Sequence, residues 1–228
     1  MNSFEHHLRE LRRRLIFTSI FIVLATAGVF YKSGMILSFF QTDLGFSLNA
    51  FTPFEVFYTQ LMISIIIGIV LTLPVIVYQA LKFAEPGLTR REYTSLRNFL
   101  PFSIILFIGG ATFAYQFIVK TSLAFFQAFS SASTVNSVWG LQSTIGFALK
   151  LSTFTGIFFQ LPIISALLAR LGLINSGMMK QYRRYFIIAV LVLAAFATPP
   201  DIISQALITL PMLGLYEASI HIVKRINK

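Results

Sequence analysis

The sequence predicts an all-α polytopic membrane protein with six transmembrane helices, and three observations support this fold class. Of the 228 residues, 56% are hydrophobic and only 11% are charged, whereas soluble domains usually carry about 25% charged residues. The mean hydropathy is +0.78. Charged residues gather in short segments beside long apolar stretches, which is typical of a chain that crosses a bilayer repeatedly. No polar stretch is long enough for a separate soluble domain, so we expect residues 1–228 to form one transmembrane domain.

The amino-terminal segment, residues 3–15, is predicted to form an amphipathic helix on the membrane surface. Its apolar residues, from Phe4 to Leu15, recur at helical spacing, and its other faces carry charged side chains. The first span is expected over residues 15–31. Residues 32–54 then indicate a loop with a short apolar patch that lies along the membrane.

The next three spans follow from long apolar stretches and their flanking signals. Residues 52–55 (TPFE) are typical of a helix start, with a capping threonine and a glutamate three residues later. The second span is therefore expected over residues 55–79, followed by a polar loop over residues 82–97. The third span, residues 98–126, is longer than a bilayer requires. The fourth span is expected over residues 141–168.

The last two spans are predicted to form a short hairpin. Residues 185–198 are an unbroken apolar run of 14 residues. Such a helix is about 21 Å long, whereas the hydrocarbon core of a bilayer is about 30 Å thick. The segment Pro199, Pro200, Asp201 reverses the chain, and the sixth span is expected over residues 202–223. Short fifth and sixth helices beside a long third helix predict a concave bundle that thins the bilayer locally.

The basic residues predict the orientation in the membrane. The amino-terminal segment, the 82–97 loop and a 170–184 loop carry four each, and the carboxyl-terminal tail carries three, so 15 of the 18 Lys and Arg residues lie on one side. Lys32, Lys120 and Lys150 are the exceptions. The positive-inside rule places the basic side and both termini in the cytoplasm. We therefore expect a multi-pass protein of the inner (cytoplasmic) cell membrane.

No motif for catalysis or cofactor binding is present in the sequence. The chain has no cysteine, no HExxH zinc motif, no G-x-S-x-G motif and no glycine-rich phosphate loop. Its lone histidine near the end of the last span, His221, is interpreted as an interfacial residue. Because these motifs are missing, we expect no enzyme activity, no cofactor and no metal ion. The net charge of +10 is explained by membrane topology, so we expect no nucleic-acid partner.

Two carboxylates stand out because each lies inside an arginine-rich segment of the predicted cytoplasmic side. These are Glu10 and Glu92. One interpretation is that each makes local ion pairs, for example Glu10 with Arg14 at a spacing of four residues on a helix. The other is that both carboxylates accept guanidinium groups from a ligand, since arginine binds carboxylates through planar paired hydrogen bonds.

Polar residues in the last three spans form a second candidate set, because polar groups at membrane depth are costly and are often functional. Gln160 shares a helical face with Thr153 and Gly156, a pattern found at helix–helix contacts. Glu217 is a candidate for an ion pair with an arginine of the tail or loops, or for a functional role. For Asp201 a cap on the last helix is favoured.

The sequence resembles the TatC family, the core membrane subunit of the twin-arginine protein translocase, over nearly its whole length. Each matching segment is short, but together, in order and with six spans, they are specific. The segments are residues 7–15 (HLRELRRRL), 52–55 (TPFE), 73–79 (LPVIVYQ), Phe83 with 85–88 (EPGL), 113–115 (FAY), 158–162 (FFQLP), 184–185 (RY), 198–201 (TPPD), 204–205 (SQ), 210–211 (LP) and 216–217 (YE).

This resemblance implies a receptor for folded cargo proteins whose signal peptides carry paired arginines. It implies that Glu10 and Glu92 receive those arginines, and that Arg12, Arg14 and Phe83 belong to the same site. It further implies single-span partner subunits of the TatA/TatB type, other copies of the chain, and transport driven by the proton motive force. The residues implied in partner-helix contact are Thr153, Gln160, Gln205 and Glu217.

The chain departs from the family pattern at Gln160, where a glutamate is common. Glutamine donates and accepts hydrogen bonds but does not ionise, which argues against a proton-linked role and leaves a polar contact with a partner helix. The alternative function is a secondary transporter of small solutes, favoured by the polar residues and prolines in the spans and opposed by the absence of internal repeats. An intramembrane enzyme is a third possibility, opposed by the absence of a nucleophile–base pair.

Overall fold

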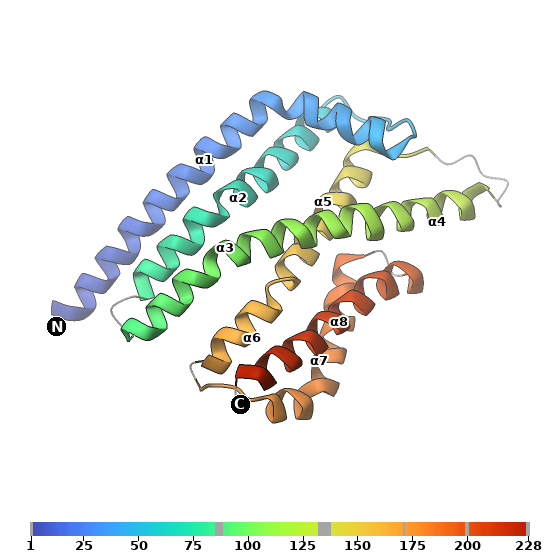
Figure 1. Ribbon diagram of the computed structural model, residues 1–228. Coiled ribbons are helices and arrows are strands. Elements are labelled where there is room, and N and C mark those ends of the chain that lie inside the picture. The colour runs from blue at the N-terminus through green and yellow to red at the C-terminus, as the bar shows by residue number, and fades with distance from the viewer. Residues whose placement is uncertain (1, 85–88, 132–137, 171, 199–200, 227–228) are drawn as a thin grey trace. The chain divides into compact units, whose positions relative to one another are not determined.

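The computed structural model describes residues 2–84, 89–131, 138–170, 172–198 and 201–226 (Figure 1). The side chains of residues 2–8, 80, 81, 84, 91, 92, 95 and 96 lie outside this description. The described part is helical, and its single β-bridge joins Asn49 to Gly140. The elements are α1 (Asn2–Leu44), α2 (Glu55–Ala84), α3 (Arg90–Phe113), the π-helix η2 (Ala114–Val119), α4 (Lys120–Ser131), α5 (Leu141–Phe158), α6 (Leu161–Arg170), α7 (Ser176–Ala197) and α8 (Ile202–Ile226). An all-α fold is therefore confirmed.

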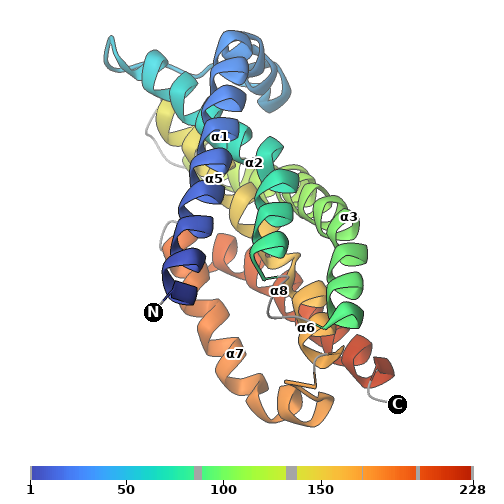
Figure 2. The same cartoon turned by 90° about the vertical axis from the view of Figure 1, so that its left-hand side faces the viewer.

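The chain forms two units. The first contains Met1–Phe46 and Thr52–Ile104, and the second contains Ser47–Phe51 and Ile105–Lys228. In the first unit, α1 and α2 lie side by side along most of their length (Figures 1 and 2). The first part of α3 completes this unit.

A glycine allows α1 and α2 to approach closely. A Cβ atom added to Gly68 of α2 would lie 2.9 Å from the Cα and backbone nitrogen of Thr26 in α1, which is closer than real Cβ contacts. Only hydrogen fits at this position, as is common where membrane helices pack backbone to backbone. The crossing of α1 over α2 is therefore fixed by a small residue.

The first helix is longer than the sequence predicts. We predicted a loop over residues 32–54, whereas α1 continues without interruption to Leu44. The side chains of Val29, Ser33, Leu37 and Phe40 are buried at intervals of three and four residues, so the second half of α1 has its own packed face. The loop therefore begins only after Leu44, at Gly45, whose φ of 75° suits a glycine after a helix.

The predicted polar loops are also partly helical. Of the loop expected over residues 82–97, residues 82–84 belong to α2 and residues 90–97 to α3. Of the loop expected over residues 170–184, the part from Ser176 onward belongs to α7. Asn175 caps this helix, because its side-chain oxygen accepts a hydrogen bond of 2.8 Å from the backbone nitrogen of Met178.

In the second unit, the second part of α3, η2 and α4 follow one another without a break, whereas the predicted fourth span is divided. The chain turns at Phe159 and Gln160, between α5 and α6. Pro162 has no N–H and cannot continue the hydrogen-bonding pattern of α5, which explains the interruption. The ring of Phe159 packs beside Gly110 of α3, where any added Cβ atom would overlap it.

Five helical segments of the described residues are long and apolar enough to cross a membrane. The exception among the predicted spans is α7, whose 22 residues include the basic residues Lys180, Arg183 and Arg184. Its apolar part is therefore short, as predicted. In contrast, α8 has 25 residues, which is longer than the predicted 202–223 span and long enough to cross. The five segments are Arg9–Leu44, Glu55–Gln79, Arg97–Ser131, Leu141–Arg170 and Ile202–Ile226.

Candidate functional site

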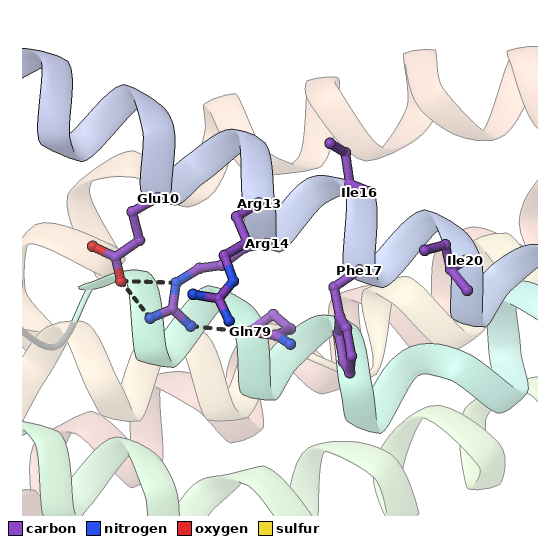
Figure 3. Close-up of a pocket in the computed structure, with 7 residues that line it drawn as sticks. All are labelled: Glu10, Arg13, Arg14, Ile16, Phe17, Ile20 and Gln79. Atoms are coloured by element: carbon purple, nitrogen blue, oxygen red, sulfur yellow. Dashed lines mark hydrogen bonds and ion pairs between the residues drawn. The ribbon is translucent and has the colours of Figure 1, made fainter.

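A hydrogen-bonded cluster joins the beginning of α1 to the end of α2 in the first unit (Figure 3). Arg14 donates to Oε1 of Glu10 from Nε at 3.0 Å and from Nη2 at 2.5 Å. Its Nη1 atom donates to Oε1 of Gln79 in α2 at 3.0 Å. The side chains of Arg14 and Glu10 are 20% and 25% exposed, so the ion pair is partly shielded from solvent. The local ion pair predicted for Glu10 is thus present.

This cluster forms one wall of a cavity of about 480 Å³. The polar end carries Glu10, Arg13 and Arg14, one carboxylate and two guanidinium groups, and the other end is apolar. Figure 3 shows Arg13 beside Arg14, and Phe17 directed toward α2. The described residues that line it are Glu10, Arg13, Arg14, Ile16, Phe17, Ile20 and Gln79. A carboxylate that holds a guanidinium beside apolar walls suits a peptide with an arginine next to hydrophobic residues.

The other residues predicted for this site are at the same end of the first unit or outside the described side chains. Arg12 and Phe83 are exposed, Phe83 by 37%, and neither lines the cavity. The backbone of Glu92 belongs to the beginning of α3, but its side chain lies outside the description. The beginnings of α1 and α3 and the end of α2 lie at one end of this unit (Figures 1 and 2).

Two polar residues that line the cavity, Gln79 and Arg13, were not predicted as site residues. Gln79 is the polar residue at the end of a long apolar stretch, and this position is the sequence signal that points to it. Arg13 was counted only for topology. Its direction toward the cavity depends on the packing of α1 against α2, which no local pattern gives.

In the second unit, polar side chains hold the α7–α8 hairpin together. Arg183 donates from Nη2 to Oε2 of Glu217 at 2.6 Å, so Glu217 pairs with an arginine, as one interpretation of the sequence suggested, although this arginine belongs to a helix. Gln205 of α8 donates from Nε2 to the carbonyl oxygen of Leu191 in α7 at 3.0 Å. Lys150 of α5 donates to the carbonyl oxygen of Phe196.

The reversal between these helices is only partly described, because Pro199 and Pro200 lie outside the described residues. Asp201 caps α8, since its Oδ1 atom accepts a hydrogen bond of 2.6 Å from the backbone nitrogen of Ser204. The capping role predicted for Asp201 is therefore confirmed.

The predicted face formed by Thr153, Gly156 and Gln160 is interrupted by the turn after α5. Gly156 contacts Phe107 of α3, where an added Cβ atom would lie 3.1 Å from the ring, so this part of the predicted helix–helix contact is present. Gln160 lies in the turn and its Nε2 atom is 3.5 Å from the carbonyl oxygen of Gly156. Thr153 is half-buried. Contact of these residues with a partner helix stays a prediction.

The described residues contain no group of three or more His, Cys, Asp or Glu side chains arranged to hold a metal ion.

Comparison with known proteins agrees with this description. Residues 6–211 match the family model described as "Sec-independent protein translocase protein (TatC)". TatCy of Bacillus subtilis (strain 168) is 37% identical over 225 residues, covering 97% of this chain and 89% of the relative. A TatC of Listeria innocua is 34% identical over 233 residues, covering 99% and 94%. A crystal structure described as the twin arginine translocase receptor TatC superposes with a TM-score of 0.84 at 32% identity, covering 97% of this chain and all of that one. This multi-pass membrane chain therefore belongs to the TatC family of Sec-independent protein translocase subunits.

Proposed function

We propose that this chain is the receptor subunit of a twin-arginine translocase and that it binds the paired arginines of signal peptides on folded cargo proteins. The carboxylate of Glu10 carries this proposal. It already accepts two hydrogen bonds from a guanidinium group, that of Arg14, beside a cavity with apolar walls. A cargo arginine would offer the same donors, and Arg14 would then turn toward Gln79, to which it is already bonded.

A second carboxylate is required, because one acid beside two arginines does not attract a doubly charged peptide. The described lining of the cavity has a formal charge of +1 from Glu10, Arg13 and Arg14. Glu92 lies in the first turn of α3, and the beginning of α3 lies at the same end of the unit (Figure 1). We assign Glu92 as the acceptor of the second signal-peptide arginine, with Arg12 and Phe83 at the margin of the site. The proposal includes a cytoplasmic location for this end and for both termini, in the inner cell membrane.

The second unit is proposed to contact the single transmembrane helices of TatA/TatB-type subunits, which assemble for export driven by the proton motive force. The side chains of α7 that support this role are large, apolar and exposed, including Ile188, Val192 and Phe196. The polar candidates are Thr153, Gln160, Gln205 and Glu217. Cysteines placed at residues 153 and 205 are expected to form disulfides with cysteines in a partner helix, and a cysteine at Asp43 in the first unit is not.

Peptide binding to the purified protein in nanodiscs tests the receptor function. A signal peptide with paired arginines should bind, and the same peptide with paired lysines should bind at least about tenfold more weakly, because lysine lacks the planar fork of donors. Glu10→Ala and Glu92→Ala should each remove this difference. Asp43→Ala removes the same charge at the opposite end of α1 and should retain the difference between the two peptides. Equal binding of both peptides to the unmodified protein would refute the proposal.

A further inference from the structure

Arg13 stands apart from the hydrogen-bonded cluster of Glu10, Arg14 and Gln79. Its side chain is exposed and lines the cavity beside Glu10 and Arg14. No hydrogen bond or ion pair connects it to any residue of the described part of the chain, whereas Arg14 has both Glu10 and Gln79. The described residues that line the cavity therefore carry a formal charge of +1 at its polar end, which favours an anion beside Arg13.

An apolar groove continues from this cavity along α1. It has a volume of about 410 Å³ and shares Ile16 and Ile20 with the first cavity. Arg13, Ile16, Ile20 and Leu24 follow one another at intervals of three and four residues, so they lie on one face of the helix. The groove is lined by Leu15, Ile16, Ser19, Ile20, Val23 and Leu24.

The side chains on this face of α1 are exposed. Ile16 and Ile20 are 51% and 52% exposed, and Val23 and Leu24 are both 64% exposed. Because α1 is long and apolar enough to cross a membrane over Arg9–Leu44, such side chains face lipid. The groove is therefore accessible to molecules of the bilayer.

The distance along α1 from Arg13 to Leu24 matches the thickness of one leaflet of the hydrocarbon core. Leu24 lies 11 positions after Arg13, which is about 16 Å along a helix at about 1.5 Å per residue. Half of the hydrocarbon core of a bilayer is about 15 Å. A guanidinium group at one end and an apolar groove of this length have the dimensions of a phosphate headgroup followed by an acyl chain.

We propose that the first helix holds one anionic phospholipid, with its phosphate on Arg13 and an acyl chain in the groove formed by Ile16, Ile20, Val23 and Leu24. Guanidinium groups bind phosphate oxygens through charge-assisted hydrogen bonds, and basic pockets at the cytoplasmic level of membrane helices bind anionic headgroups. The lipid neutralises the surplus charge beside Glu10. The apolar segment of a signal peptide is the competing occupant, which a crosslink from this face of α1 distinguishes from a lipid.

Lipid retention measured by native mass spectrometry tests this site. The full chain in mild detergent is incubated with phosphatidylglycerol or with phosphatidylcholine of the same acyl chains. The unmodified protein should retain phosphatidylglycerol at least about fivefold more, and R13Q should lose this preference. R9Q removes the same charge one turn earlier, outside both cavities, and should keep it. Equal loss in R9Q and R13Q, or equal retention of the two lipids, would overturn the site.

Two further experiments identify the occupant of the groove without depending on peptide recognition at Glu10. Inorganic phosphate at the same concentration should not displace the retained lipid, because it lacks the acyl chain, and displacement would reduce the site to an anion site. A photo-crosslinking residue at position 20 should form adducts with phosphatidylglycerol in vesicles. Adducts with an added signal peptide and none with lipid would assign the groove to cargo and refute the proposal.

Discussion

Arg183 in α7 and Glu217 in α8 form a 2.6 Å ion pair although they are 34 positions apart in the chain. The pair joins the basic first half of α7 to the last turns of α8, and it places both charges at the same level of the hairpin. Because the two side chains are 48% and 41% exposed, the pair sets the register of the two helices more than it stabilises them.

A double-mutant cycle measures this pair. Arg183→Gln and Glu217→Gln are each expected to lower the free energy of unfolding by less than about 1 kcal/mol, with a coupling energy of about 0.2–1 kcal/mol between them. Unfolding of the purified protein in mixed micelles gives the values, and the coupling should shrink at high salt. A coupling above about 2 kcal/mol would mean that the pair is shielded, against the exposure stated above.

Tyr216 is expected to contribute more to the stability of the hairpin than the ion pair does. Its hydroxyl donates to the carbonyl oxygen of Met179 at 2.7 Å, and its ring stacks on Phe186 with centroids 3.9 Å apart. Tyr216→Phe removes only the hydrogen bond and should cost about 1 kcal/mol. Tyr216→Ala also leaves a cavity and should cost about 3–5 kcal/mol. Tyr185→Phe, at an exposed position, is the control. Thermal unfolding in detergent should show the largest loss for Tyr216→Ala, a smaller loss for Tyr216→Phe and the smallest for the control.

Gly68 should be intolerant of any side chain. Gly68→Ala places a methyl group 2.9 Å from the backbone of Thr26, which forces α1 and α2 apart and should cost about 1–3 kcal/mol. The matched control is Gly28→Ala in α1, where nothing lies within 4 Å of the added atom. This control should be neutral or stabilising by up to about 1 kcal/mol, because alanine favours helix. Equal unfolding temperatures for the two variants would contradict the close contact.

The sequence was sufficient to predict the apolar part of each helix that it expected and the first residues of α2, α5 and α8, but not how far the helices extend beyond the apolar stretches. Residues 90–97 and 176–184 were assigned to loops because they are basic, whereas both are helical. Charge indicates which residues face water, and a helix that continues past the membrane keeps all its backbone hydrogen bonds. The same reasoning missed the second half of α1, whose apolar face is interrupted by polar residues.

In the candidate site, the contact between residues close in the sequence was predicted, whereas the contact between distant residues was not. The pair of Glu10 with Arg14 follows from a spacing of four residues on a helix and was predicted. The bond from Arg14 to Gln79 spans 65 positions and depends on the register of α1 against α2. That register is set by contacts such as Gly68 with Thr26, which composition and periodicity do not indicate.

The most direct test of the proposed receptor function is the coupling energy between Glu10 and a signal-peptide arginine. Peptides carrying arginine or its neutral isostere citrulline at each position of the pair are titrated against the unmodified protein and Glu10→Gln. We predict that citrulline at one position weakens binding to the unmodified protein but not to the variant, with a coupling of about 1–3 kcal/mol. A coupling of zero at both positions would show that Glu10 does not receive a cargo arginine.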